Sequence, residues 1–363
     1  MKRRATIKEV AAKAGVSIAT VSNVFSGRKP VNADLQKKVK KVARDLSYEV
    51  NRVASQLRSG QANVVGVLVP DLDDVFFTSL VSQLEVAAQK DGYDILVASS
   101  RDDVRLEESR LRTLLAWRPS GLIVVPCSDA APVGLNREIG RLPMVFADRV
   151  SPESSPVDTV TLDNQEAGQI AARYLLSVQQ RDVVLAASNL DISPIRARIK
   201  GAVDLIRSET GSTPTVIQLG SNAERGADIF RQWLERHPRP SAVFALTNVT
   251  TLSTLSAFGQ LRIDIPDSVS LIGFDDYPWM SARKTPLTAI RQPIQEIAQA
   301  SWDLLRARMD GDRAPKRSII LPASLQVRDS VTPPNRAEAR DDIAPIKQEN
   351  SAQPKADKSG VLH

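Results

Sequence analysis

The stretch TIKEVAAKAGVSIATVSNVF, Thr6–Phe25, decides the fold of the first part of this chain. Thr6 and Glu9 have the spacing of a capping box, which satisfies two backbone donors at the start of a helix. Gly15 suits the position that ends this helix, and Ser17 is a natural N-cap for the next one. Two short helices joined by a turn that contains glycine predict a helix-turn-helix.

The second of these helices is expected to have two different faces. Val21, Val24 and Phe25 can pack inward, which leaves small and polar side chains on the opposite face. Those outward residues are Ile18, Ala19, Ser22 and Asn23. A third, longer helix is predicted after Asn32, with a buried apolar stripe and mostly exposed lysines.

The positive charge of the chain is concentrated in its first sixty residues. They contain 14 Lys and Arg against four Asp and Glu, a formal charge of +10, whereas the whole chain carries +6. A strongly basic head on a mildly acidic body indicates a contact with nucleic acid. A solvated basic face is the alternative, and charge alone does not decide between the two.

The residues after the third helix continue the pattern as VARDLSYEVNRVASQLRSG, residues 42–60. Together with the helix-turn-helix, this segment resembles the head of the lactose-repressor (LacI/GalR) family of bacterial transcription regulators. The resemblance implies that the second helix enters the major groove of DNA. The DNA-binding residues that it implies are Thr6, Ile18, Ala19, Thr20, Ser22, Asn23, Tyr48, Asn51, Val53, Ala54 and Leu57.

The chemistry of the second helix is compatible with those roles. Asn23 can make paired hydrogen bonds to adenine, and Ile18 or Ala19 can contact a thymine methyl group. Thr20 and Ser22 would hold phosphates, which fix the register without distinguishing the sequence. Packing within the head is the alternative role for Ile18 and Ala19.

By the same resemblance, residues 51–62 form a hinge helix and linker that become ordered on operator DNA. Two turns of helix cannot bury enough apolar surface to be stable alone in water. In a dimer, two hinge helices would pack in the minor groove, and Leu57 would wedge a base step apart. Val53 and Ala54 are small enough for close approach. An ordinary frayed linker is the alternative.

From residue 63 the sequence alternates short apolar strands with helical stretches. Strands are predicted at 64–70, 93–99, 121–126 and 143–147, and a second series at 182–187, 215–220, 242–247 and 269–274. Such alternation predicts parallel sheets covered on both faces, and two series predict two lobes. This part resembles the periplasmic-binding-protein-like core of the same family, in which the chain crosses between the lobes three times. We expect the crossings near 162–163, 290–293 and 321–322.

The predicted fold class is an N-terminal all-α helix-turn-helix head with a hinge helix, followed by a two-lobe α/β core with parallel sheets. We expect the head at residues 1–50, the hinge and linker at 51–62, and an effector-binding and dimerisation domain at 63–332. Residues 333–363 are rich in Pro, Ala and charge, which predicts a disordered tail. This tail lacks leucine heptads, so we expect a dimer.

Lobed α/β proteins bind ligands at the carboxyl ends of their strands. The candidate effector-binding residues follow from that rule and from the family resemblance: Phe76, Asp148, Arg149, Arg196, Arg198, Asn248, Asp275 and Trp279. The resemblance implies that Arg198 grips effector oxygens, and the Asp275 carboxylate can accept bonds from ligand hydroxyls. The three arginines favour an anion such as a sugar acid or phosphosugar. Core packing is the alternative for Phe76, and an interlobe salt bridge or a solvated loop is the alternative for the charged residues.

The leading hypothesis is a sequence-specific DNA-binding regulator, expected to be a repressor. It would bind palindromic operator DNA as a homodimer, under the control of a sugar, sugar-derived acid or phosphosugar bound between the lobes. A solute-binding protein of a transport system is the alternative, but it would need an export signal and no basic head.

An enzyme is disfavoured, because the sequence has no GxxxxGK[ST] loop, no GxSxG motif and only two histidines. We expect no cofactor, no metal site and, with Cys127 as the only cysteine, no internal disulfide. No apolar run is long enough to span a membrane, and no secretory segment is evident. The expected location is the bacterial cytoplasm, with the nucleoid when operator is bound.

Overall fold

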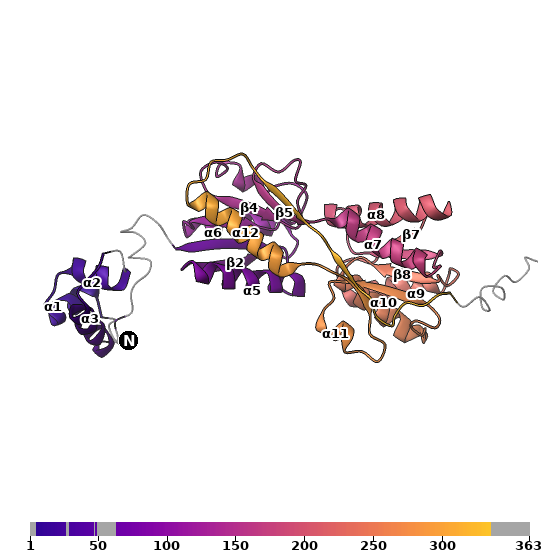
Figure 1. The fold of residues 1–363 in the computed structure, drawn as a ribbon, viewed down its shortest axis with the longest axis horizontal. Coiled ribbons are helices and arrows are strands. Elements are labelled where there is room, and N and C mark those ends of the chain that lie inside the picture. The colour runs from indigo at the N-terminus through magenta and orange to yellow at the C-terminus, as the bar shows by residue number, and fades with distance from the viewer. Residues whose placement is uncertain (1–4, 27–28, 47, 49–62, 335–363) are drawn as a thin grey trace, which may run out of the picture. The chain divides into compact units, whose positions relative to one another are not determined.

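The structure of the chain is a computed structural model that describes residues 5–26, 29–46, 48 and 63–334. The predicted hinge segment at 51–62 and the tail from residue 335 lie outside the described residues. The described part contains a helical head and two six-stranded sheets with their helices (Figure 1). The predicted fold class, a helical head followed by an α/β core with parallel sheets, is confirmed.

The head consists of α1 (Ile7–Ala14), α2 (Ile18–Ser26) and α3 (Ala33–Asp45). The expected capping box is present, because the Thr6 backbone N–H donates to Glu9 Oε2 at 2.6 Å and the Glu9 N–H donates to Thr6 Oγ1 at 3.4 Å. Gly15 ends α1 with a left-handed φ of 66°. The buried residues that hold the three helices together are Val10, Ala11, Ala14, Val21, Val24, Val39 and Ala43.

The first sheet has the strand order β11-β5-β4-β3-β1-β2. Its strands are β1 (Val64–Val69), β2 (Asp94–Ser99), β3 (Gly121–Val124), β4 (Met144–Ala147), β5 (Asp158–Leu162) and β11 (Ser318–Leu321). The pairs β1–β2, β1–β3 and β3–β4 are parallel, as the apolar runs predict. A 3₁₀ turn, η1 (Val133–Leu135), lies between β3 and β4.

Helices cover both faces of the first sheet: α5 (Val75–Lys90), α6 (Val104–Ala116) and α12 (Ile294–Met309). A Cβ on Gly66 would lie 3.7 Å from Leu114 of α6, and a Cβ on Gly121 would lie 2.8 Å from Leu305 of α12. Gly121 is paired with Val65, the neighbour of Gly66 in β1. Because side chains alternate along a strand, α6 and α12 cover opposite faces.

The second sheet has the strand order β12-β10-β9-β8-β6-β7. Its strands are β6 (Val183–Ala187), β7 (Thr215–Gln218), β8 (Ala242–Ala245), β9 (Ser270–Phe274), β10 (Thr288–Arg291) and β12 (Ser324–Gln326). Strands β7, β6, β8, β9 and β10 pair in parallel, and β12 is antiparallel to β10. Its helices are α7 (Asn164–Ser177), α8 (Ser193–Thr210), α9 (Ala223–Leu234), α10 (Asn248–Leu261) and the short α11 (Pro278–Ser281).

The second sheet is also buried on both faces, which explains its continuous apolar strands. In β6, Val183 and Leu185 pack in the cluster that contains residues of α7 and α8. Their neighbours Val184 and Ala186 pack in the cluster that contains residues of α9 and α10. The alternation places one pair of helices on each face of the sheet.

The chain passes between the two sheets three times, because β1–β5 belong to the first sheet, β6–β10 to the second, β11 to the first and β12 to the second. These passages follow Leu162, Arg291 and Leu321, where the sequence predicts them. By contacts, the chain also divides into two compact units: the first unit includes β1–β4, and the second unit includes β6–β10 and β12.

Candidate functional site

The outward face of α2 is the first candidate site, and local hydrogen bonds set its start. The Thr20 N–H donates to Ser17 Oγ at 3.1 Å, so Ser17 caps the helix as expected. Val21 and Val24 are buried, whereas Ile18 is 40% exposed. Ala19 is also exposed, and Ser22 and Asn23 are half-buried. The structure therefore keeps Ile18 and Ala19 out of the buried core of the head.

The other predicted DNA-binding residues are only partly described. Thr6 is exposed at the start of α1, where its hydroxyl group belongs to the capping box. Tyr48 is half-buried, and its ring packs against Phe25 with a centroid separation of 5.8 Å. The other predicted contacts, Asn51, Val53, Ala54 and Leu57, lie outside the described residues.

Arg198 is the first member of a buried polar cluster in the second unit, at the carboxyl ends of its strands. Its side chain is 4% exposed, although it carries a full charge. Nε donates to Asn164 Oδ1 at 2.8 Å, and Nη1 donates to the Leu246 carbonyl at 2.6 Å. The guanidinium group lies 3.7 Å from the centroid of the Phe274 ring, a cation–π contact. These contacts compensate the arginine for its lost hydration.

Asp275 is the second member, directly after β9. It is 8% exposed, and it accepts from Gln292 Nε2 at 2.6 Å and from the Asn248 N–H at 3.0 Å. Burial raises the pKa of Asp275, whereas the charge of Arg198 and the hydrogen bond from Gln292 oppose that shift. Its φ of 80° is left-handed, a conformation that non-glycine residues rarely adopt. The cluster thus holds a carboxylate under strain, away from water.

Two acceptors in this cluster lack a hydrogen-bond partner within the described part of the chain. They are Asn248 Oδ1 and Gln292 Oε1, both closed off from solvent. A buried polar group left unmatched costs about 1–3 kcal/mol. Sequence reasoning missed Gln292 and Asn164. Gln292 directly follows β10, and Asn164 begins α7 two residues after β5. These positions, where the chain leaves one sheet for the other, are the signal that could have found them.

The structure does not gather all the predicted effector residues into this cluster. Arg196 is exposed, and its Nη1 donates to the Leu190 carbonyl at 3.2 Å. Trp279 is half-buried against the apolar cluster on the α9 and α10 face. Asp148 is buried with a φ of 59°, and Arg149 is half-buried. Of the predicted residues, the structure brings together Arg198, Asn248 and Asp275, and Asp148 lies near enough for its charge to add to the rise in the pKa of Asp275.

Phe76 belongs to the first unit. It is 4% exposed in α5 and lies against Phe77, with the ring centroids 5.1 Å apart and nearly perpendicular. This is the core packing that the sequence leaves open as an alternative role. Nothing in this arrangement ties the ring to a ligand.

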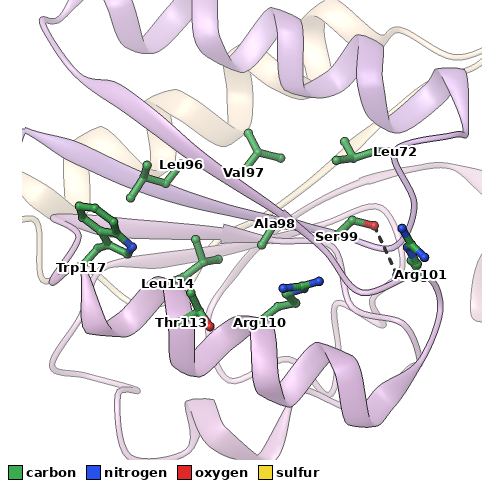
Figure 2. Close-up of a pocket in the computed structure, with 10 residues that line it drawn as sticks. All are labelled: Leu72, Leu96, Val97, Ala98, Ser99, Arg101, Arg110, Thr113, Leu114 and Trp117. Atoms are coloured by element: carbon green, nitrogen blue, oxygen red, sulfur yellow. Dashed lines mark hydrogen bonds between the residues drawn. The ribbon is translucent and has the colours of Figure 1, made fainter.

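The free edge of the first sheet carries an open groove of about 370 Å³. Figure 2 shows Leu114, Thr113 and Arg110 of α6, and Trp117 directly after that helix, beside residues of β2. Trp117 is 54% exposed, Leu72 is 41% exposed and Val97 is 38% exposed. The remaining lining residues are Leu96, Ala98, Ser99 and Arg101. β2 is the last strand of its sheet, so the groove runs beside a strand edge that lacks a neighbour in the described structure.

A second buried polar group lies in the first unit. Glu107 of α6 is 1% exposed, and its Oε1 accepts the Cys127 N–H at 2.7 Å. Cys127 Sγ lies 2.8 Å from Ser100 Oγ. Burial raises the pKa of Glu107, and it raises the pKa of the Cys127 thiol to about 12. A thiol in this state is inert, because the thiolate is the reactive form.

Within residues 5–26, 29–46, 48 and 63–334, no group of three or more His, Cys, Asp or Glu side chains is arranged to hold a metal ion. Over the same ranges, no helix combines the length and the apolar character that a membrane crossing requires.

A helix-turn-helix head joined to a two-sheet α/β core with a buried polar cluster defines the class of ligand-binding transcription regulators. Sequence comparison agrees with this class. Residues 6–51 match a family described as "Bacterial regulatory proteins, lacI family", and residues 172–331 match "Periplasmic binding protein-like domain". The chain is 31% identical to the HTH-type transcriptional regulator PtxS of Pseudomonas aeruginosa over 336 residues, which cover 91% of this chain and 96% of PtxS. The chain therefore belongs to the LacI family of DNA-binding transcriptional regulators.

Solved structures show the same fold. The lac repressor dimer bound to operator and the anti-inducer ONPF is similar with a TM-score of 0.81 and 26% identity, over 91% of this chain and all of that one. A complex of the transcriptional regulator CelR with cellobiose is similar with a TM-score of 0.67 and 25% identity, over 90% of this chain and all of that one.

Proposed function

We propose that this protein is a repressor that binds palindromic operator DNA as a homodimer, and that binding of a small-molecule effector raises or lowers its affinity for the operator. The observation that carries the proposal is the outward face of α2, where Ile18 and Ala19 are exposed on a strongly basic head. Basic residues supply the phosphate contacts, and the exposed helix supplies contacts to base edges. A regulator of chromosomal genes acts in the cytoplasm, on the nucleoid.

Genome-wide capture of DNA bound in the source cell tests this proposal and yields the operator. Fluorescence anisotropy titrations then compare the operator with a random duplex. Asn23→Ala is expected to lose about 1–3 kcal/mol of discrimination at one base pair. Thr20→Ala, the control, is expected to weaken binding to both duplexes equally. If no palindromic fragment outcompetes bulk genomic DNA, the proposal is wrong.

We place the effector at the cluster of Arg198, Asn248 and Asp275. Sites of this type lie at the carboxyl ends of parallel strands. The proposed effector is a sugar, a sugar-derived acid or a phosphosugar, and the cellobiose bound by CelR, a protein of the same fold, supports that range. Isothermal titration with neutral sugars and sugar acids tests the class.

The contacts of the cluster suggest how the effector acts on the rest of the chain. Arg198 is bonded to Asn164, which follows β5, and Asp275 is bonded to Gln292, which follows β10. Both amide side chains belong to segments where the chain passes from one sheet to the other. A ligand that binds Arg198 or Asp275 therefore affects these connecting segments through the hydrogen bonds to Asn164 and Gln292. Such coupling is reciprocal, so operator DNA must change the affinity for effector by the same factor.

For the homodimer, we propose that a second copy covers the groove along β2. An exposed strand edge with apolar side chains is a template for association, and the related lac repressor is a dimer in its operator complex. Val97→Lys is expected to yield monomers in light scattering after gel filtration. Val133→Lys is the matched control, because Val133 is 74% exposed and lies outside the groove. Dimers in both variants would contradict this location.

A further inference from the structure

The outer face of α3 carries a concentration of positive charge that the proposed contacts of α2 do not involve. The helix has the sequence ADLQKKVKKVARD, and all five of its basic side chains are exposed. With about 3.6 residues per turn, four of the five lie opposite Val39 and Ala43, the buried residues of the helix. These four residues, the α3 stripe, are Lys37, Lys40, Lys41 and Arg44.

The α3 stripe is electrostatically unfavourable in the head by itself. Lys37 and Lys41 are four positions apart, as are Lys40 and Arg44, and like charges at that spacing repel one another along a helix. The acidic residues of α3 lie near its two ends. Within the described part of the chain, no side chain of the stripe forms an ion pair or a hydrogen bond. A polyanion bound along this face would relieve the repulsion.

The α3 stripe and the outward face of α2 lie on different sides of the head. The residues that α2 and α3 bury belong to one apolar cluster, which contains Val21, Val24, Val39 and Ala43. Each outward face points away from that cluster. The fifth basic residue, Lys38, lies on the flank of α3 toward the turn between α1 and α2, because a Cβ on Gly15 would lie 3.9 Å from its Nζ. A straight duplex along α2 therefore leaves the stripe exposed.

The charge density of the stripe matches that of double-stranded DNA. Lys37 and Arg44 are about 10 Å apart along the helix axis, at about 1.5 Å per residue. A duplex carries about six negative charges over that length. Lysine and arginine on such a face bind phosphates without distinguishing the sequence. Double-stranded DNA is also the polyanion that the proposed function brings to the head.

We infer that the α3 stripe is a second DNA-binding surface of the head, and that it binds the phosphate backbone of a duplex segment other than the one on α2. The inference goes beyond the proposed function, which places DNA on the outward face of α2. A protein that holds one segment through α2 captures a second segment through α3, so it can pass between segments without first dissociating.

The test counts the duplexes that each protomer of the full chain binds, by sedimentation velocity at low ionic strength. The probe is a random-sequence duplex of about one helical turn. Wild type is expected to bind two duplexes per protomer. The stripe variant, in which all four stripe residues are changed to Gln, is expected to bind one. Gln is a good helix former, and circular dichroism shows that the variant folds.

A matched control removes the same amount of charge from the second unit. It changes to Gln four exposed basic residues that lie far from α3 in the sequence: Arg181, Arg225, Arg236 and Arg239. This control is expected to bind two duplexes per protomer, like wild type. The second duplex is also expected to weaken with salt, with a slope of about −3 to −4 in log K against log salt concentration, because four cations release counterions.

Ala19→Glu separates this inference from the proposed function, because it places a negative charge on the outward face of α2. It is expected to bind one duplex per protomer, and none when it is combined with the stripe variant. Two duplexes on the stripe variant would show that the stripe is only a solvated face, and one duplex on wild type would show that no second surface exists. Either result would overturn the inference. Two duplexes on Ala19→Glu would contradict the proposed contact of α2, while the stripe variant still decides the role of α3.

Discussion

A methyl group added at Gly201 is expected to force apart α7 and α8, the helices that carry Asn164 and Arg198. Helices α7 and α8 pack so closely that a Cβ on Gly201 would lie 2.0 Å from the Gln165 carbonyl oxygen. A Cβ on Gly168 would lie 2.1 Å from the Arg198 carbonyl oxygen. The obstacle in both cases is backbone rather than a flexible side chain. Relief of the clash therefore requires movement of a whole helix by about 1 Å.

The size of the effect can be worked out from three contributions. Overpacking in a tight core costs about 1–3 kcal/mol, and a backbone clash belongs near the upper value. Alanine recovers about 1 kcal/mol of helix propensity relative to glycine. A shift of α8 also stretches the bond from Arg198 Nε to Asn164 Oδ1, and a hydrogen bond to a charged group contributes about 1.5–3 kcal/mol. We expect Gly201→Ala to lower the free energy of unfolding by about 3–5 kcal/mol.

Equilibrium unfolding in urea, followed by tryptophan fluorescence and circular dichroism, measures this difference. Gly259→Ala is the matched control, because Gly259 is exposed in α10 and a Cβ there would meet no atom within 4 Å. That variant is expected to be more stable than wild type by about 0.5–1 kcal/mol. Unchanged or increased stability in Gly201→Ala would refute the close approach of the two helices.

Three further predictions concern other parts of the chain. The Cys127 thiol, with a pKa of about 12 against an ordinary 9.0, is expected to react with DTNB at pH 8 about 1,000-fold more slowly in the native than in the unfolded protein; equal rates would contradict its burial. The raised pKa of Glu107 means that the folded state favours the protonated carboxyl group, so the protein loses folding stability as the pH rises from about 4.5. Glu107→Gln keeps the acceptor for the Cys127 N–H, and in urea unfolding we expect it to be more stable than wild type above that pH and equally stable below it. Leu57→Ala is expected to weaken operator binding far more than random-duplex binding in anisotropy titrations, because the wedge acts only on the bent operator; equal losses would count against the hinge helix.

Much of the fold follows from local patterns that the sequence displays directly. The Thr6 capping box and Gly15 mark the first helix, and both are present in the structure. The long apolar runs became the central strands of both sheets, because strands buried on both faces need no polar alternation. The strands that the prediction missed, β5, β10, β11 and β12, have three to five residues each. Length does not explain the miss, because the predicted strands β3, β4, β7 and β8 have only four residues each. The missed segments become strands because a distant strand pairs with them.

The candidate site also combines features that the local sequence predicts with features that only distant contacts decide. Arg196 and Arg198 are two residues apart on one helix, so at 3.6 residues per turn they lie on nearly opposite faces. The sequence does not indicate which of the two arginines is buried. Arg198 is buried because α7 and the second sheet cover the face of α8 on which it lies. Gln292 lies 17 residues after Asp275 in the sequence, and no local pattern links the two.

The sequence by itself determined the helix-turn-helix head, the alternation of strands and helices and the positive charge of the head, because caps, apolar runs and charges act over a few residues. Only the tertiary structure decided which charged and amide side chains come together at the carboxyl ends of the strands of the second sheet. That meeting depends on the burial of Arg198 and Asp275, and a buried charge persists only where residues distant in sequence supply its hydrogen bonds.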